Sequence, residues 1–219
     1  MQAFGRAKTA LAVLTLAVFT GLSLWHGGRA AWSNVTTLQS RWLITQWRYG
    51  TGPVFDEQRW QDARSNLLSA LQYTPGNPLL LEDLGFLDGW RAYLLGTPEV
   101  GSQEYMRKHD LLASAITSYR DATRLRPTYP HVWANLAVVK HRRGEHDAEL
   151  WLAFDKALHY GPTESGVQIA LAQVAFPHWA TLDPERRRQC LAMWASATQA
   201  TRTRLKFLAN INLITVPGL

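Results

Sequence analysis

Apolar and small residues in the middle of this chain recur three and four positions apart, a spacing that places them on one face of a helix. Three such stripes are Ala63/Leu67/Ala70, Ala115/Tyr119/Ala122 and Phe154/Ala157. A proline stands five positions after the last alanine of each stripe, at Pro75, Pro127 and Pro162. Because proline cannot continue a helix, each stripe is predicted to belong to a helix that ends shortly before its proline.

A second type of helix is predicted upstream of two of these stripes. It carries a large apolar residue, a leucine and a small residue, as in Trp133/Leu136/Ala137 and Leu81/Leu84/Gly85. The two types alternate at a period of about 34 residues, which is the tetratricopeptide pattern. Small residues let paired helices approach closely, while tryptophan and tyrosine fill the groove beside them. The pattern therefore predicts an all-α fold of degenerate tetratricopeptide-like repeats.

The repeat pattern weakens toward both ends of the chain. An atypical first repeat is predicted to open with a helix over about residues 35–49, which the Gly-Thr-Gly-Pro sequence of residues 50–53 interrupts. At the other end, Asp183 and Pro184 suit a helix N-cap and the first helical turn. A last helix is therefore predicted to cover much of residues 184–209.

The N-terminal segment holds a long uncharged stretch, Thr9–Gly28. At the rise of a helix this stretch covers about 30 Å, which is the thickness of the hydrocarbon core of a bilayer. Arg6 and Lys8 precede it, and positive charge there favours an N-terminus inside the cell. Trp25 and Trp32 take the positions of an interfacial aromatic belt. These features predict one N-terminal transmembrane helix, with these four residues at the membrane interface and the lipid bilayer as its partner.

This prediction divides the chain into a membrane anchor, residues 1–31, and an extracytoplasmic helical-repeat domain, residues 32–219, with a C-terminal capping helix and an apolar tail. The expected location is the inner (cytoplasmic) membrane, crossed once, with the N-terminus inside and the body in the periplasm. A cleaved secretion signal is the alternative, with residues 28–30 as a poor small-x-small cleavage site. The body is exported in both cases.

Half of the net charge belongs to the predicted anchor. The whole chain carries a net charge of +6, but residues 32–219 contain 20 basic and 17 acidic residues, a net charge of +3. A nucleic-acid-binding protein would show a clustered basic stripe, so no nucleic-acid partner is expected. Cys190 is the only cysteine, and its apolar neighbours favour a buried thiol over a reactive one.

Two histidines invite a metal-binding interpretation. His141 and His146 are five positions apart, and acidic residues flank His146. Ligands on one helix face stand three or four positions apart, and Gly144 predicts a turn between these two. A polar turn between helices is therefore the favoured interpretation. No metal, cofactor or catalytic residue is expected, and the protein is expected to be non-enzymatic.

Most candidate partner-binding residues lie late in the chain. The first turn of the last predicted helix contains Arg186, Arg187 and Arg188, which oppose the helix dipole unless a partner offsets them. A solvated face is the alternative to a docking patch for an acidic protein, an acidic glycan or anionic lipid. Three tryptophans fit no repeat position and could anchor a peptide or stack on sugar rings: Trp90, Trp179 and Trp194. Core packing is their alternative role.

The chain resembles a known family over about residues 36–190. The similarity rests on Arg126-Pro127, Trp133-Ala134-Asn135-Leu136-Ala137, Lys140, Gly144-Glu145, Gly161-Pro162, Val167-Gln168, Trp179, Leu182, Pro184 and Arg187. These residues resemble the VpsP-type exopolysaccharide biosynthesis proteins of bacteria. That resemblance implies a tetratricopeptide-like extracytoplasmic domain on a single anchor, associated with surface-polysaccharide machinery. It implies no catalytic residue.

The function expected from these features is that of a membrane-anchored scaffold. Its helical pairs would bind envelope proteins of a polysaccharide assembly or export complex through their concave face. Two alternatives are open: an accessory subunit of another membrane protein complex, and a direct glycan-binding module that uses the tryptophans and arginines above.

Overall fold

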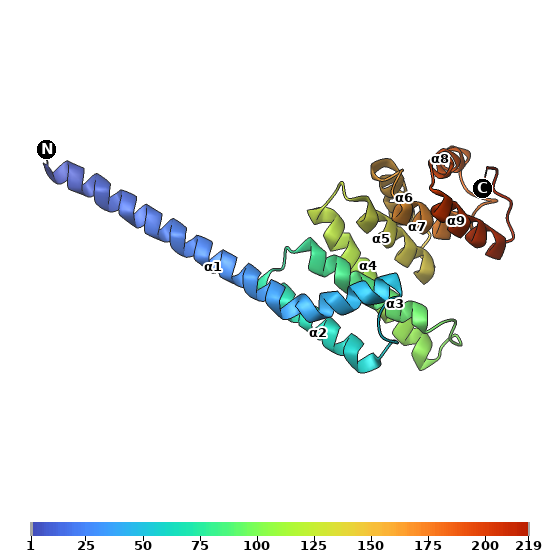
Figure 1. Ribbon diagram of the computed structural model, residues 1–219, viewed down its shortest axis with the longest axis horizontal. Helices are drawn as coiled ribbons and strands as arrows, with labels where there is room; N and C mark the ends of the chain where they lie inside the picture. Colours follow the sequence, from blue (N-terminus) through green and yellow to red (C-terminus); the bar gives the residue numbers. More distant parts are fainter. Residues whose placement is uncertain (1, 219) are drawn as a thin grey trace. The chain divides into compact units, whose positions relative to one another are not determined.

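The computed structural model describes residues 2–218, and the side chains of residues 2–10 and 12 lie outside the description. Within this range the only regular elements are α-helices, as the fold class predicted (Figure 1). They are α1 (Gln2–Tyr49), α2 (Glu57–Tyr73), α3 (Pro78–Leu94), α4 (Gln103–Leu125), α5 (Pro130–Arg143), α6 (Ala148–Tyr160), α7 (Ser165–Ala175), α8 (Pro184–Ala195) and α9 (Gln199–Ile211). The chain forms two compact units, which divide between Leu80 and Leu81. α1 runs without a break through residue 31, where the predicted anchor ends.

The first unit is built on the contact between α1 and α2. The predicted stripe of α2 is buried, and Leu67 and Ala70 are at most 1% exposed. α1 buries small polar residues, among them Ser33 and Thr37, and the Thr37 hydroxyl donates to the Ser33 carbonyl of its own helix. Arg29 donates from α1 to the carbonyl oxygens at the end of α2, which satisfies acceptors that a helix C-terminus leaves free.

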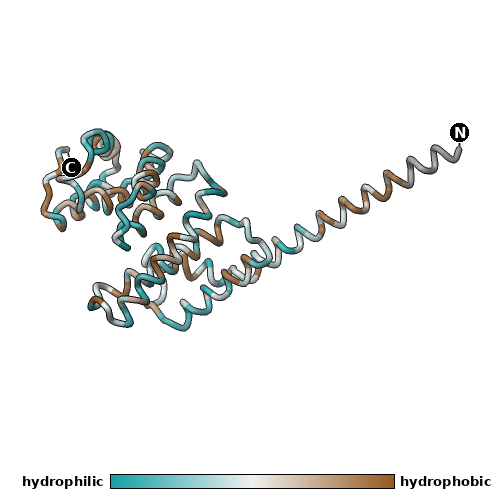
Figure 2. The backbone as a smooth tube through the Cα atoms, turned by 180° about the vertical axis from the view of Figure 1, so that it is seen from behind, coloured by the Kyte–Doolittle hydropathy of each residue, from teal (hydrophilic) through white to brown (hydrophobic). Residues whose placement is uncertain are grey.

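The predicted membrane anchor is wrong. Among the described residues, no helix is both long and apolar enough to cross a membrane. The uncharged stretch of α1 contains Thr15, Thr20 and His26 as well as glycines, and lack of charge is a weaker property than apolarity. Figure 2 shows brown segments alternating with paler ones along the part of α1 that follows residue 12. The prediction of a single-pass inner-membrane location, with the body in the periplasm, is corrected by the same finding.

The second unit is a series of helices in which neighbours along the chain pack on each other. α5 contacts α4, α6 and α7, α6 also contacts α7 and α8, and α7 contacts α9, so these contacts join helices that are one or two apart along the chain. The predicted stripe of α4 faces this core, with Ala115 and Ala122 fully buried and Tyr119 3% exposed. The ring of Tyr119 occupies the space where a side chain at Gly85 of α3 would lie. The small residue predicted in this helix therefore allows the close approach of α3 and α4.

Helix ends follow the sequence signals in most places. α2, α4 and α6 each end two residues before their proline, and Asp183 caps α8 by accepting from the backbone N–H of Glu185 and Arg186. The predicted last helix is in fact two helices, α8 and α9. The hydroxyl of Ser196 donates to the carbonyl of Met193 (2.7 Å), and the hydroxyl of Thr198 caps α9. These hydroxyls replace helical backbone hydrogen bonds and so interrupt the helix.

Candidate metal centre

Three histidines from three positions along the chain meet in the second unit. His141 lies in the last turn of α5, His146 lies in the turn before α6, and His178 lies in the connection between α7 and α8. Gly144 follows α5 with φ 82°, in the left-handed region that favours glycine. This turn reverses the chain within a few residues, so that the ring of His146 lies beside that of His141.

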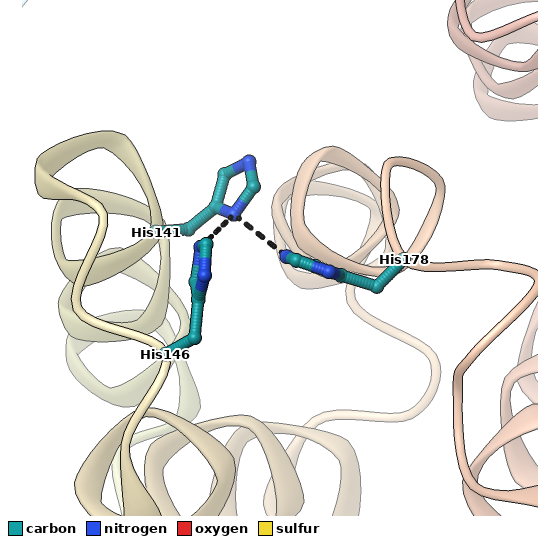
Figure 3. Close-up of side chains that lie close together, drawn as sticks. All are labelled: His141, His146 and His178. Atoms are coloured by element: carbon teal, nitrogen blue, oxygen red, sulfur yellow. Dashed lines mark hydrogen bonds between the residues drawn. The ribbon is translucent and has the colours of Figure 1, made fainter.

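The ring nitrogens of these residues point toward one another (Figure 3). Nδ1 of His141 lies 3.3 Å from Nε2 of His146 and 3.3 Å from Nε2 of His178. One ligand atom from each ring lies within 4.8 Å of the other two. The ring planes of His146 and His178 are nearly perpendicular, at 78° with their centroids 4.5 Å apart.

Hydrogen bonding alone does not satisfy this arrangement. A neutral imidazole has one N–H and one lone pair, and they are on different nitrogens. Nδ1 of His141 can therefore donate or accept one in-plane hydrogen bond, but it has two nitrogen neighbours at 3.3 Å. A cation at the centre would accept one lone pair from each ring, and so would satisfy all three nitrogens at once.

The surroundings keep two of the rings neutral at pH 7. Burial, followed by the nearby His178, His146 and Arg142, lowers the pKa of His141 from 6.5 to about 4. Burial and His146 also lower the pKa of His178. Trp151 of α6 packs edge-on against His178, with ring centroids 6.0 Å apart, which limits the movement of that ring. Neutral imidazole is the form that binds metals.

The acidic residues beside His146 are engaged elsewhere. Lys140 is 1% exposed, and its Nζ donates to Glu145 (2.9 Å), Asp147 (2.9 Å) and Glu149 (2.7 Å). Glu145 also pairs with Arg143. The second oxygen of Asp147 caps α6 by accepting from the N–H of Leu150. The described residues that form the metal-ligating group are therefore the three histidines alone.

The arginines predicted to bind a partner all have contacts within the chain. Arg186 forms a bidentate pair with Asp155 of α6, at 2.7 and 2.9 Å. Arg187 donates to the carbonyl oxygens of the α7–α8 connection, and Arg188 pairs with Glu185 one turn away. Arg186 lies in the wall of a groove of about 860 Å³ between α6 and α8, whose apolar lining includes Leu158 and Met193.

The three predicted tryptophans do not form one surface. Trp194 is 1% exposed and donates to the carbonyl of Gln168, so its ring belongs to the core. Trp179 is half-buried against it, with ring centroids 5.8 Å apart, and the guanidinium of Arg187 lies over its ring. Trp90 is half-buried on α3, where it stacks on Phe86.

The residues predicted at a membrane interface lie on α1. Trp25 and Trp32 are 63% and 59% exposed. The guanidinium of Arg29 lies 5.7 Å from the ring centre of Trp25. Arg6 and Lys8 have side chains outside the described residues.

Sequence reasoning missed the third histidine of the cluster. In the sequence, His141 and His146 stand out as a pair. A metal site formed by this pair is disfavoured there, because ligands five positions apart do not share a helix face. His178 lies 37 residues from His141, and no spacing rule relates the two. The contact between α5 and α7 brings them together, and only the fold supplies it.

Compared with known proteins, the chain matches no family model, no curated protein and no solved structure.

Proposed function

We propose that this chain is a helical-repeat protein that binds a divalent transition-metal ion of the zinc class through His141, His146 and His178. The observation that carries the proposal is the convergence of three imidazole nitrogens on one point, with Nδ1 of His141 3.3 Å from both partners. A Zn–N bond of about 2.0–2.1 Å and tetrahedral geometry require ligand nitrogens about 3.3–3.4 Å apart. Two of the three nitrogen pairs have this spacing already.

The ligand chemistry selects the class of ion. Imidazole nitrogen suits zinc, copper, nickel and cobalt, whereas calcium and magnesium require several oxygen ligands. The carboxylates closest in sequence, Glu145 and Asp147, are held by Lys140. A site built from three histidines therefore favours zinc or a related ion over a hard cation.

The test is metal stoichiometry in the full-length chain with no affinity tag. After removal of metal with EDTA, calorimetric titration with zinc sulfate should give one ion bound per chain. H178A should lose this binding, because the two remaining histidines supply too few ligands. H159A is the matched control, since His159 is an exposed histidine on α6 outside the cluster. Equal stoichiometry in wild type, H178A and H159A would contradict the proposal.

The groove between α6 and α8 favours a second function, binding of a protein partner. Its volume of about 860 Å³ is that of a ligand-sized site. Its lining combines apolar side chains, such as Leu158 and Met193, with charged ones of both signs, which suits a partner segment with both apolar and charged side chains. In this proposal the chain is a non-enzymatic tetratricopeptide-like scaffold. The resemblance to VpsP-type proteins makes components of surface-polysaccharide assembly the first candidate partners.

Site-specific photocrosslinking tests this second function. A photoreactive residue in place of Gln189, which lines the groove, should capture one defined protein in the producing cells. The same residue in place of the exposed Lys206 on α9 is the control. Capture of a glycosyltransferase, polymerase or export subunit at position 189 alone would support the polysaccharide role. Identical products at both positions would exclude the groove.

A further inference from the structure

We infer that the metal ion, once bound, takes its fourth ligand from outside the chain, and that this ligand is an anionic oxygen group such as a carboxylate or phosphate. The inference rests on the proposed metal function and concerns the chemistry that such a site performs. Three protein ligands with one open position are the arrangement of reactive zinc sites, whereas structural sites are closed by four protein ligands.

The chain offers no fourth ligand at this position within the described residues. The group of side chains whose ligand atoms lie within 4.8 Å of one another consists of three histidines, and it includes no carboxylate or thiol. Glu145 gives one oxygen to Lys140 and the other to Arg143. Asp147 gives one oxygen to Lys140 and the other to the N-cap of α6. Moving either carboxylate to the metal would leave the charge of the buried Lys140 with one partner fewer.

The charge at the site favours an anionic fourth ligand over a neutral one. Three neutral imidazoles leave the full charge of a divalent ion uncompensated. Arg142 adds a second positive group next to His141, and its guanidinium donates to the neutral amide of Gln173 at 3.0 Å rather than to a carboxylate there. A positive centre without a protein anion attracts an anionic ligand from solution.

The open position is accessible. His146 is exposed, and it lies on the turn between α5 and α6 rather than inside a helix pair. His141 and His178 are half-buried, so the protein covers the metal on their side and leaves the side of His146 to solvent. Figure 3 shows the three rings between the ribbon that carries His141 and His146 and the ribbon that carries His178.

Cobalt substitution provides the test, because the visible absorption of Co²⁺ reports its ligands directly. The full-length, tag-free protein is loaded with one equivalent of Co²⁺ in a buffer whose only added anion is perchlorate, which coordinates weakly. Sodium acetate and sodium phosphate are then titrated separately, at constant ionic strength. We expect a saturable change in the cobalt bands with each probe, and the probe that saturates at the lower concentration identifies carboxylate or phosphate as the preferred group. H178A should show no such bands, and H159A should match wild type.

The outcomes separate this inference from the function on which it rests. One Co²⁺ bound per chain with a spectrum that acetate and phosphate do not change would overturn the anion inference and leave the metal site intact. Failure of wild type to bind Co²⁺ more tightly than H178A would overturn both. A spectral change that perchlorate reproduces at equal ionic strength would also overturn the inference, since it would be a salt effect and not coordination.

Discussion

Nε2 of His178 lies 3.3 Å from Nδ1 of His141, although 37 residues separate them along the chain. The contact joins the end of α5 to the connection between α7 and α8. A ligand that binds both rings would therefore join two segments that the backbone connects only by way of α6 and α7. Because the metal would join residues far apart in the sequence, its binding should raise the free energy of unfolding of the second unit.

Gly144 should control both stability and metal affinity. Its φ of 82° is costly for a residue with a side chain, so G144A should lower the free energy of unfolding by about 1–2 kcal/mol. The same change should weaken zinc binding, because the turn places His146 beside His141. G144N should recover most of the loss, since asparagine tolerates this backbone conformation better than alanine. Urea unfolding and zinc titration of the three proteins measure the two effects.

Lys140 should be among the least replaceable polar residues of the second unit. It is 1% exposed with three carboxylate acceptors, and removing one member of a buried ion cluster costs about 3–5 kcal/mol. The carboxylates are partly exposed, so K140M should lower the free energy of unfolding by an amount at the lower end of this range, about 3 kcal/mol. K206M, which changes an exposed lysine on α9, should stay within about 0.5 kcal/mol of wild type. Equal urea midpoints for the two variants would contradict this role.

Glu149 should contribute to stability in a defined pH window. Hydrogen bonds from Arg120 and then Lys140 lower the pKa of its carboxyl from 4.5 to about 2. A lowered folded-state pKa stabilises the fold above the unfolded value, and this stability is lost as pH falls through the folded value. The difference in unfolding free energy between wild type and E149Q should thus be largest above pH 4.5 and shrink as pH approaches about 2.

The matched control for Glu149 is D121N. Asp121 forms an exposed pair with Arg124 on the same helix, so its loss should cost less than about 1 kcal/mol. Urea unfolding at a series of pH values compares the variants. A constant difference between wild type and E149Q across the range would show that the carboxylate is not held in its charged form.

Gly85 should tolerate no side chain without loss of packing between α3 and α4. A Cβ there would lie 2.9 Å from two ring carbons of Tyr119, which is buried and has little room to move. Overpacking of this kind costs about 1–3 kcal/mol, so G85A should lower the thermal midpoint. G21A is the matched control, because a Cβ at Gly21 of α1 meets nothing within 4 Å. It should be neutral or stabilising by up to about 1 kcal/mol, since alanine favours helix.

The thiol of Cys190 should be unreactive in the native protein. It is fully buried, and burial raises the pKa of its thiol to about 12. A thiol-specific reagent should therefore label it only at the rate of unfolding, and completely in denaturant. The variant C190A/K206C, which moves the thiol to an exposed position, should react on mixing. Rapid labelling of the native wild type would show that α8 opens readily.

The predictable part of the fold is the part that repeats. Leu67, Ala115 and Phe154 are buried as their helical spacing indicates, because burial of one helix face leaves a periodic trace in the sequence. The membrane segment was predicted from length and lack of charge, and no helix of the described residues is both long and apolar enough to cross a membrane. The break between α8 and α9 depends on two hydroxyl hydrogen bonds, at Ser196 and Thr198, which helical periodicity does not register.

The candidate site was the less predictable part. His141 and His146 were visible in the sequence as a pair, but a spacing of five fits no helix face, and the left-handed turn at Gly144 is what joins them. His178 joins the histidine cluster through a tertiary contact, and such a contact leaves no signal in the local sequence. The arginines after Asp183 were visible as charges, but the pairing of Arg186 with Asp155 joins two helices and leaves no trace in the local sequence.

The ion cluster around Lys140 means that α5 and α6 cannot be exchanged as an independent pair of helices. Arg120 on α4 shares Glu149 with Lys140, so charges on three successive helices balance one another. An engineer who grafted α5 and α6 alone into another helical-repeat array would carry Lys140 but leave Arg120 behind. A transfer that keeps this charge balance would have to include α4, α5 and α6 together.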